Sequence, residues 1–251
     1  MSGTVRSELD GPIGWVIIDN QPRRNALSAA MFAQLAQQLR ALDVNPEVRV
    51  IVLRGAGNGA FAAGADISEL NTTIERPATT SERVFSLSTP TVAMIQGACM
   101  GAGMLLALSA DVRIASDDAR FAVPAVRLGI AYPYAGVLQM VAAAGPAAAA
   151  EILLTGAAFD ATDAARWGLV SRVVAKEQLE STVGAVVAAI ASGAPLSVRA
   201  VKTAIAAVLA GSPPDAVADA EKAIQACWES EDLRRGQRAF AEKRASTFEG
   251  K

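Results

Sequence analysis

The first half of the chain alternates short apolar runs with amphipathic or glycine-rich stretches. The apolar runs are rich in β-branched residues and predict strands at residues 14–19, 48–55, 89–97 and 111–116. Residues 28–43 predict an amphipathic helix that Ser28 caps, and residues 104–110 predict an apolar helix. Strands that alternate with helices in this way predict parallel pairing through crossover connections, and therefore an α/β fold.

The second half of the chain is predominantly helical by the same criteria. Glycine and proline separate the predicted helices, which cover residues 147–156, 162–168, 176–193, 196–211, 215–230 and 231–248. The composition changes near residue 190. We therefore expect a core of residues 1–190 and a C-terminal extension of residues 191–251. The helical composition of residues 191–251 fits an extension of the core better than an independent domain.

The overall composition narrows the class of protein. Of the 251 residues, 52% are hydrophobic and 19% are charged, so the chain can bury a sizeable core and is not expected to be disordered. The formal net charge of -2 comes with no basic block, so nucleic acid is not an expected partner. Charge, serine or glycine interrupts every long apolar run, and the N-terminus shows no signal peptide. We expect no membrane partner and a cytoplasmic location.

The absence of histidine is the most informative single count. It excludes Ser-His-Asp and Cys-His catalytic arrangements, and with only two cysteines the usual zinc sites are excluded too, so no metal is expected. Cys99 and Cys227 lie in apolar surroundings and are expected to be reduced thiols. Acid–base chemistry would have to come from Asp, Glu, Lys, Tyr, Cys or water.

A first glycine-rich turn follows the predicted strand at residues 48–55. Gly55, Gly57 and Ala60 match the dinucleotide-binding pattern G-x-G-x-x-A, and Glu75 follows at about the twenty-residue spacing of the ribose-binding acid. That pattern requires a helix to open within the motif, whereas turn-forming residues continue here. A phosphate-binding P-loop is excluded because no lysine follows the glycines.

A second glycine-rich turn, with Gly101 and Gly103, also follows a predicted buried strand directly. Small residues at these positions would let the following helix pack closely on the sheet, which is a sufficient structural explanation for either turn alone. Together, the two turns could bring two backbone N–H groups to one oxygen atom. That arrangement is an oxyanion hole.

At these residues the chain resembles the enoyl-CoA hydratase/isomerase (crotonase) superfamily over nearly its whole length. The resemblance rests on five segments in a fixed order, which are residues 23–28 (RRNALS), 61–70 (FAAGADISEL), 90–116, 153–174 and 230–244. It implies a crotonase-like spiral of repeated ββα units with a helical C-terminal region. It further implies a homotrimer or a dimer of trimers, in which the extension would mediate trimerisation and cover the ligand.

The resemblance also assigns a ligand and its contacts. The ligand would be an acyl-CoA thioester, so coenzyme A would enter as part of the substrate and no separate cofactor is expected. By position, the N–H groups of Ala65 and Ala102 would form an oxyanion hole for a thioester enolate. The implied CoA contacts are Arg24, Ala26, Ala63 and Ala65, together with Phe240 and Lys243 from a neighbouring subunit.

The chain departs from the family at both acid–base positions. Leu105 and Ala125 stand where hydratases carry two glutamates, so neither the two-glutamate hydration mechanism nor the one-glutamate isomerase mechanism is expected. The expected substrate pocket is instead apolar, lined by Met104, Leu105, Ala125, Val126 and Tyr134.

Three interpretations remain open. Residues 127–140 resemble methylmalonyl-CoA-decarboxylase-like members, which places Tyr132 as a candidate proton donor, although Ala65 stands where those members have histidine. The chain could instead be a non-catalytic acyl-CoA-binding protein, or a hydratase or isomerase with relocated acid–base groups. The simpler interpretation of Tyr132 is a phenol that packs on the apolar wall and donates a hydrogen bond to the backbone. We favour an enzyme that stabilises a thioester enolate.

Overall fold

Two sheets form the centre of the fold in this computed structural model, which describes residues 3–66, 84 and 86–251. The larger sheet has six strands in the order β1 (Thr4–Asp10), β2 (Ile13–Asp19), β3 (Val50–Gly55), β5 (Thr91–Ile95), β7 (Val112–Ser116) and β10 (Arg172–Val174). The smaller sheet has four strands in the order β4 (Ala60–Ala62), β6 (Ala98–Met100), β8 (Arg120–Ala122) and β9 (Phe159–Asp160).

The chain winds as a spiral that visits the two sheets in turn. The pairs β3 and β4, β5 and β6, and β7 and β8 each place one strand in the larger sheet and the next in the smaller sheet. Successive turns pair in parallel: β3 pairs with β5 and β5 with β7 in the larger sheet, and β4 pairs with β6 and β6 with β8 in the smaller sheet. The helices α3 (Ala102–Leu108) and α4 (Tyr134–Thr155) follow β6 and β8. The expected repeat of two strands and a helix is therefore confirmed.

Both faces of the larger sheet are covered, which explains its continuous apolar strands. Along β3, Ile51 and Leu53 pack into the core on one face, beside α1 (Ala29–Asp43), while Val50 and Val52 face α6 (Leu179–Ser192) on the other. Side chains of a strand alternate between faces, so a strand buried on both sides reads as an unbroken apolar run. Ser28 accepts a hydrogen bond from the Met31 N–H (3.3 Å), which confirms the predicted cap of α1.

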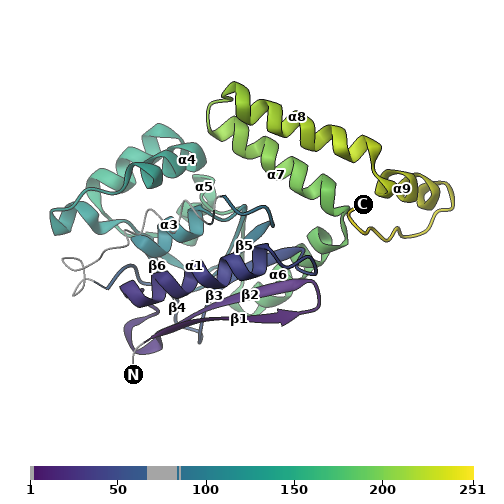
Figure 1. Cartoon of the computed structure of the whole chain (residues 1–251). Coiled ribbons are helices and arrows are strands. Elements are labelled where there is room, and N and C mark those ends of the chain that lie inside the picture. The colour runs from purple at the N-terminus through teal and green to yellow at the C-terminus, as the bar shows by residue number, and fades with distance from the viewer. Residues whose placement is uncertain (1–2, 67–83, 85) are drawn as a thin grey trace.

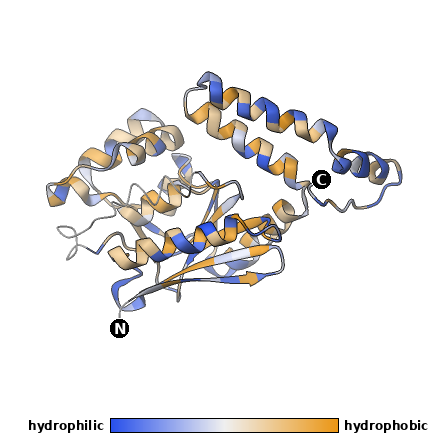
Figure 2. Ribbon diagram, in the orientation of Figure 1, coloured by the Kyte–Doolittle hydropathy of each residue, from blue (hydrophilic) through white to orange (hydrophobic). Residues whose placement is uncertain are grey.

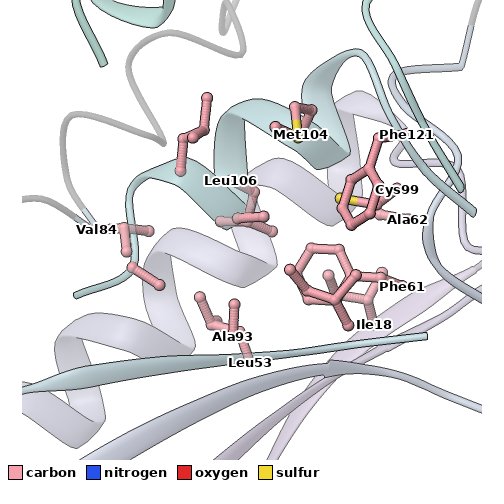
Figure 3. Close-up of a cluster of buried hydrophobic side chains, with 14 of the residues drawn as sticks. Ile18, Leu53, Phe61, Ala62, Val84, Ala93, Cys99, Met104, Leu106 and Phe121 are labelled. Carbon is pink, nitrogen blue, oxygen red and sulfur yellow. The ribbon is translucent and has the colours of Figure 1, made fainter. Parts of the chain in front are cut away.

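The main core fills the space that the spiral encloses. Phe61, Cys99 and Phe121 come from the three parallel strands of the smaller sheet and are fully buried. Figure 3 shows Phe61 beside Ile18, and Cys99 beside Phe121. Burial raises the pKa of the Cys99 thiol far above its usual range, so Cys99 behaves as a small apolar side chain.

The glycine-rich turn after β3 leads into another strand. Residues 56–59 connect β3 directly to β4, and no helix opens within the G-x-G-x-x-A motif. The dinucleotide-binding alternative is therefore wrong, because its helix N-terminus for the pyrophosphate is missing at this point. Its proposed ribose-binding residue, Glu75, lies outside the described residues.

The C-terminal helices α7 (Pro195–Leu209), α8 (Pro214–Glu229) and α9 (Glu231–Ala241) extend away from the two sheets (Figure 1). Figure 2 shows that α9 is predominantly hydrophilic. The chain then returns to the core, where Arg49 donates to the Phe248 carbonyl (2.5 Å). The Asp232 carboxylate accepts hydrogen bonds from the N–H groups of Glu249 (2.9 Å) and Gly250 (2.7 Å). The boundary of the extension near residue 190 stays a prediction.

One described helix, α4, is long and apolar enough to cross a membrane by length and composition, and α6 with α7 would pass only as a pair bent by 107°. Gly145 (φ 74°, ψ 166°) interrupts α4 immediately before Pro146. Each part is then shorter than the roughly 20 residues that a membrane span requires. The sequence of α4 therefore does not make it a continuous span.

An ion pair connects α7 to the larger sheet. Asp111 accepts hydrogen bonds from the Thr91 N–H (2.7 Å) and hydroxyl (2.8 Å), and Lys202 on α7 donates to the same carboxylate (2.7 Å). The Lys202 side chain is only 10% exposed, and it also donates to the Thr89 carbonyl (3.0 Å).

Replacing Lys202 with methionine should therefore loosen the extension. We expect Lys202→Met to lower the free energy of unfolding by about 1–3 kcal/mol, because it removes charge-assisted hydrogen bonds from a nearly buried site. Lys222→Met is the matched control, since Lys222 is exposed on α8 and forms no ion pair within the described part of the chain. Urea unfolding measures both variants, and equal effects would contradict the anchoring role.

Candidate active site

Two glycine turns lie side by side at one edge of the smaller sheet. The strands β4 and β6 are parallel neighbours, so the turns that follow them meet at the same edge. Gly64 and Gly101 adopt positive φ (111° and 48°), which side chains disfavour. A Cβ atom on Gly64 would lie 3.8 Å from the Ala102 nitrogen, and one on Gly101 would lie 3.9 Å from the Gly64 Cα. The two turns are therefore in direct contact.

Within the described part of the chain, each turn presents a free backbone N–H group at the predicted alanine. Around the first, the Leu27 N–H donates to the Gly64 carbonyl (2.8 Å) and the Asp66 N–H donates to the Leu27 carbonyl (2.8 Å). Ala65 lies between these bonded groups. Ala102 begins α3, where a first-turn N–H has no partner within the helix. Within residues 3–66, 84 and 86–251, neither the Ala65 nor the Ala102 N–H donates a hydrogen bond. The structure thus brings together the two donors that the sequence predicted.

Gly103 allows α3 to approach β4 this closely. A Cβ atom on Gly103 would lie 2.2 Å from the Ala62 carbonyl oxygen, which is a backbone atom that cannot turn aside. Any side chain here would push α3 away from β4. The spacing of the two free N–H groups depends on this absence of a side chain.

Asn25, which the sequence analysis did not single out, holds the segment that leads into β4. It is 1% exposed and has a positive φ of 58°. Its side-chain oxygen accepts a hydrogen bond from the Asn20 N–H (2.9 Å). Its amide nitrogen donates to the carbonyls of Ala56 (3.0 Å), just after β3, and Ala60 (2.8 Å), the first residue of β4. A lone asparagine among charged and small residues gave no periodic signal in the sequence.

The predicted CoA-contacting loop lies against the first turn. The Ala63 N–H donates to the Arg24 carbonyl (3.0 Å), and the Ala26 N–H donates to the Arg23 carbonyl (3.1 Å). Arg24, Ala26, Ala63 and Ala65 therefore belong to one continuous surface beside the free N–H groups. The N–H groups of Ala26 and Ala63 are already used.

The described carboxylate that is nearest to Ala65 in the sequence already forms an ion pair. Asp66 directly follows Ala65, and its side chain forms an ion pair with Arg23. Its carboxylate is 11% exposed, while the Arg23 side chain is 61% exposed. Asp66 thus fixes the loop that carries Arg24 to the turn that carries Ala65. Glu69, a further acidic residue of this segment, lies outside the described residues.

The two positions that lack glutamate are apolar in the structure as well. Leu105 is 1% exposed, and Ala125 packs at the edge of the same core. Met104 is equally buried, so it belongs to the core, whereas Val126 is 45% exposed. Tyr134, at the first position of α4, is 82% exposed. The predicted pocket residues therefore lie at different depths. Leu105 and Ala125 are the two that could form an apolar wall.

The Tyr132 hydroxyl donates a hydrogen bond to the Gly101 carbonyl (3.1 Å). The ring packs beside Leu105 and over Gly136, where an added Cβ atom would lie 2.5 Å from Tyr132 Cε1. Burial, and secondarily Cys99, raises the pKa of the Tyr132 hydroxyl far above its usual range, so the phenol stays protonated. The expected phenol-to-backbone bond is confirmed, and it ends on the second turn of the site.

Phe240 and Lys243 do not meet these turns within one chain. Phe240 is 89% exposed on α9, and Lys243 follows the end of that helix. Figure 1 shows α9 at the far end of the extension, away from α3 and β6. A contact between these residues and the site would require a neighbouring subunit, which stays a prediction.

Comparison with known proteins decides the family. A sequence model of the enoyl-CoA hydratase/isomerase family matches residues 10–251 of the chain. The chain belongs to this family. A probable enoyl-CoA hydratase (echA8) from Mycobacterium bovis is 31% identical, over 98% of this chain and 97% of its own length. A short-chain-enoyl-CoA hydratase from Clostridium acetobutylicum is 33% identical, over 94% of each chain.

A solved structure confirms the crotonase-like fold of this family member. The enoyl-CoA hydratase from Bacillus anthracis matches with a TM-score of 0.92 and 28% identity, covering 99% of this chain and 100% of that one. The mixed sheets and the helical C-terminal region are thus shared with a complete family member. The family model and this match together confirm the fold class predicted from the sequence.

Replacing Gly103 with alanine should separate the two turns. We expect Gly103→Ala to lower the free energy of unfolding by about 1–3 kcal/mol, since an overpacked core must shift its backbone. The matched control is Gly184→Ala in α6, where an added Cβ atom would meet nothing within 4 Å. That change should stabilise by roughly 0.5–1 kcal/mol through helix propensity. Thermal unfolding compares them, and a neutral Gly103→Ala would refute the close packing.

Proposed function

We propose that this protein binds an acyl-CoA thioester and stabilises its enolate with the N–H groups of Ala65 and Ala102. The observation that carries the proposal is the pair of free backbone donors on adjoining turns in a member of the enoyl-CoA hydratase/isomerase family. Fixed N–H groups aimed at a developing negative charge need no reorganisation as that charge appears. One such donor is worth about 10²–10³-fold in kcat.

The reaction does not use the two-glutamate mechanism. With Leu105 and Ala125 at the acid–base positions, no carboxylate is available there to activate water or to move a proton. Loss of one general acid–base group costs ~10²–10⁴-fold, so hydration by that route would be slow. An enolate-forming step that needs no base at these two positions suits the site best.

Decarboxylation is the second candidate, and Tyr132 is the observation that favours it. In this reaction the bond between Cα and the carboxylate breaks, CO₂ leaves, and the electron pair passes to the thioester oxygen as an enolate. A proton must then be added to Cα, which requires a donor but no base. Tyr132 carries a protonated hydroxyl. This hydroxyl donates to the Gly101 carbonyl, which belongs to the same peptide group as the Ala102 N–H. In this role Tyr132→Phe should lose ~10²–10⁴-fold in rate.

The CoA moiety would lie along the loop of Arg24, Ala26 and Ala63, with Phe240 and Lys243 supplied by a neighbouring subunit of a trimer. The apolar wall at Leu105 and Ala125 suits an apolar part of the acyl group. Binding without turnover is the remaining alternative, and it would leave the same contacts in place.

Removing one N–H donor tests the proposal directly. Ala102 is the first residue of α3, a position that accepts proline without losing a helical hydrogen bond. We expect Ala102→Pro to lower kcat by about 10²–10³-fold while the melting temperature stays close to that of the native chain. Ala102→Gly keeps the N–H group and is the control. Equal turnover of Ala102→Pro and the native protein would remove Ala102 from the site.

Substrate screening separates the candidate reactions. We expect turnover in at least one of three assays, namely crotonyl-CoA hydration, enoyl-CoA isomerisation and methylmalonyl-CoA decarboxylation, with hydration the weakest. Calorimetry with the same thioesters measures binding in parallel. Tight binding with no turnover would favour an acyl-CoA-binding protein, and no binding would overturn the proposed function itself.

A further inference from the structure

The hydrogen bond from Tyr132 ends on the peptide that supplies one of the two proposed donors. The Gly101 carbonyl and the Ala102 N–H belong to the same peptide group. The carbonyl accepts hydrogen bonds from the Tyr132 hydroxyl (3.1 Å) and from the Leu105 N–H (3.0 Å). A carbonyl oxygen has two lone pairs, so both acceptor positions of this peptide are filled.

Hydrogen bonds to a peptide oxygen change its nitrogen. Resonance moves electron density from the nitrogen to the oxygen, and a donor at the oxygen favours that shift. The N–H group then carries more positive charge and becomes a better donor, by about 10–30% for each added bond. The Ala102 N–H is the recipient of this effect in the present structure.

The phenol is held in place by its surroundings. Gly136 leaves room for the ring, because an added Cβ atom would lie 2.5 Å from Tyr132 Cε1 and 2.8 Å from Leu105 Cδ1. The ring contacts the core cluster that contains Leu106 and Cys99. The raised pKa keeps the hydroxyl a donor throughout the neutral pH range. Burial and packing therefore fix both the orientation and the protonation of this group.

We propose that Tyr132 is a positioning residue that holds and polarises the Gly101–Ala102 peptide, so that the Ala102 N–H binds enolate more strongly than neutral thioester. This inference rests on the proposed function, because it places the thioester oxygen at the Ala102 N–H. It applies to either candidate reaction, since both pass through an enolate. This role differs from proton donation because it changes the equilibrium affinity for the enolate and requires no proton transfer to the substrate.

Equilibrium binding of two probes tests this role. Butyryl-CoA presents a neutral thioester, and acetoacetyl-CoA ionises to an enolate with its own ultraviolet absorbance. We expect Tyr132→Phe to weaken binding of the acetoacetyl-CoA enolate by about two- to eightfold, the share of one oxyanion-hole donor that a single added bond supplies. Butyryl-CoA affinity should stay unchanged. Equal losses for the two probes, or no loss for either, would overturn the inference.

Two further variants guard against a general loss of structure. Thr203→Val removes another hydroxyl-to-carbonyl hydrogen bond, to Arg199 on α7 (3.0 Å), and should change neither affinity. Gly136→Ala keeps the phenol but displaces its ring, so it should reproduce the selective loss of Tyr132→Phe. In turnover, both Tyr132→Phe and Gly136→Ala should lower kcat while KM is retained. A Gly136→Ala protein with native enolate affinity would count against the inference.

A measurement without ligand makes the inference independent of the proposed function. In the nuclear magnetic resonance spectrum of the free protein, Tyr132→Phe should move the Ala102 amide proton and the Gly101 carbonyl carbon upfield. The Ala65 amide, on the other turn, is the internal reference and should not move. Unshifted Ala102 and Gly101 signals would overturn the inference even if no acyl-CoA bound. A shift without any acyl-CoA binding would instead leave the polarised peptide and remove the proposed function.

Discussion

The pairing of β4 with β6 is the constraint on which the rest of the site depends. These strands have three residues each, yet their parallel alignment brings the ends of two turns to the same edge of a sheet. Gly103 lets α3 pack against the Ala62 carbonyl, which keeps the second turn against the first. The position of two backbone atoms therefore follows from the topology of the whole spiral rather than from any local catalytic motif.

Two unpaired N–H groups in one place are unfavourable unless the surrounding structure holds them. A donor without a partner favours a rearrangement of its turn that would satisfy it. Leu27 opposes this at the first turn by bonding to Gly64 and Asp66 on either side of Ala65, and Tyr132 does so at the second by bonding to Gly101. Hydrogen bonds from other segments of the chain thus hold both turns in place.

The elements that were predictable from the sequence are those with a long repeat. The strands β3, β5 and β7, the Ser28 cap and most helices of the second half were predicted, because burial on one or two faces imposes a regular pattern. The first part of α4, from Tyr134 on, was not predicted. The strands β4, β6 and β8 were missed because three residues are too few to show alternation. The two alanines proposed for the oxyanion hole came from the family resemblance, at turns that the glycine clusters had marked. Asn25 and the partner of Tyr132 could not follow, since their contacts join segments far apart in the chain.

The return of the chain to the core after α9 has a mechanical consequence. Lys202 ties α7 to the larger sheet and Arg49 ties Phe248 to the core, so the extension is held at both ends. The Asp232 carboxylate connects the returning segment to α9. Attachment at both ends restricts rotation of the extension relative to the sheets. Phe240 is then presented at a set distance from its own sheets, and a second subunit would meet a preformed shape with little entropy left to lose.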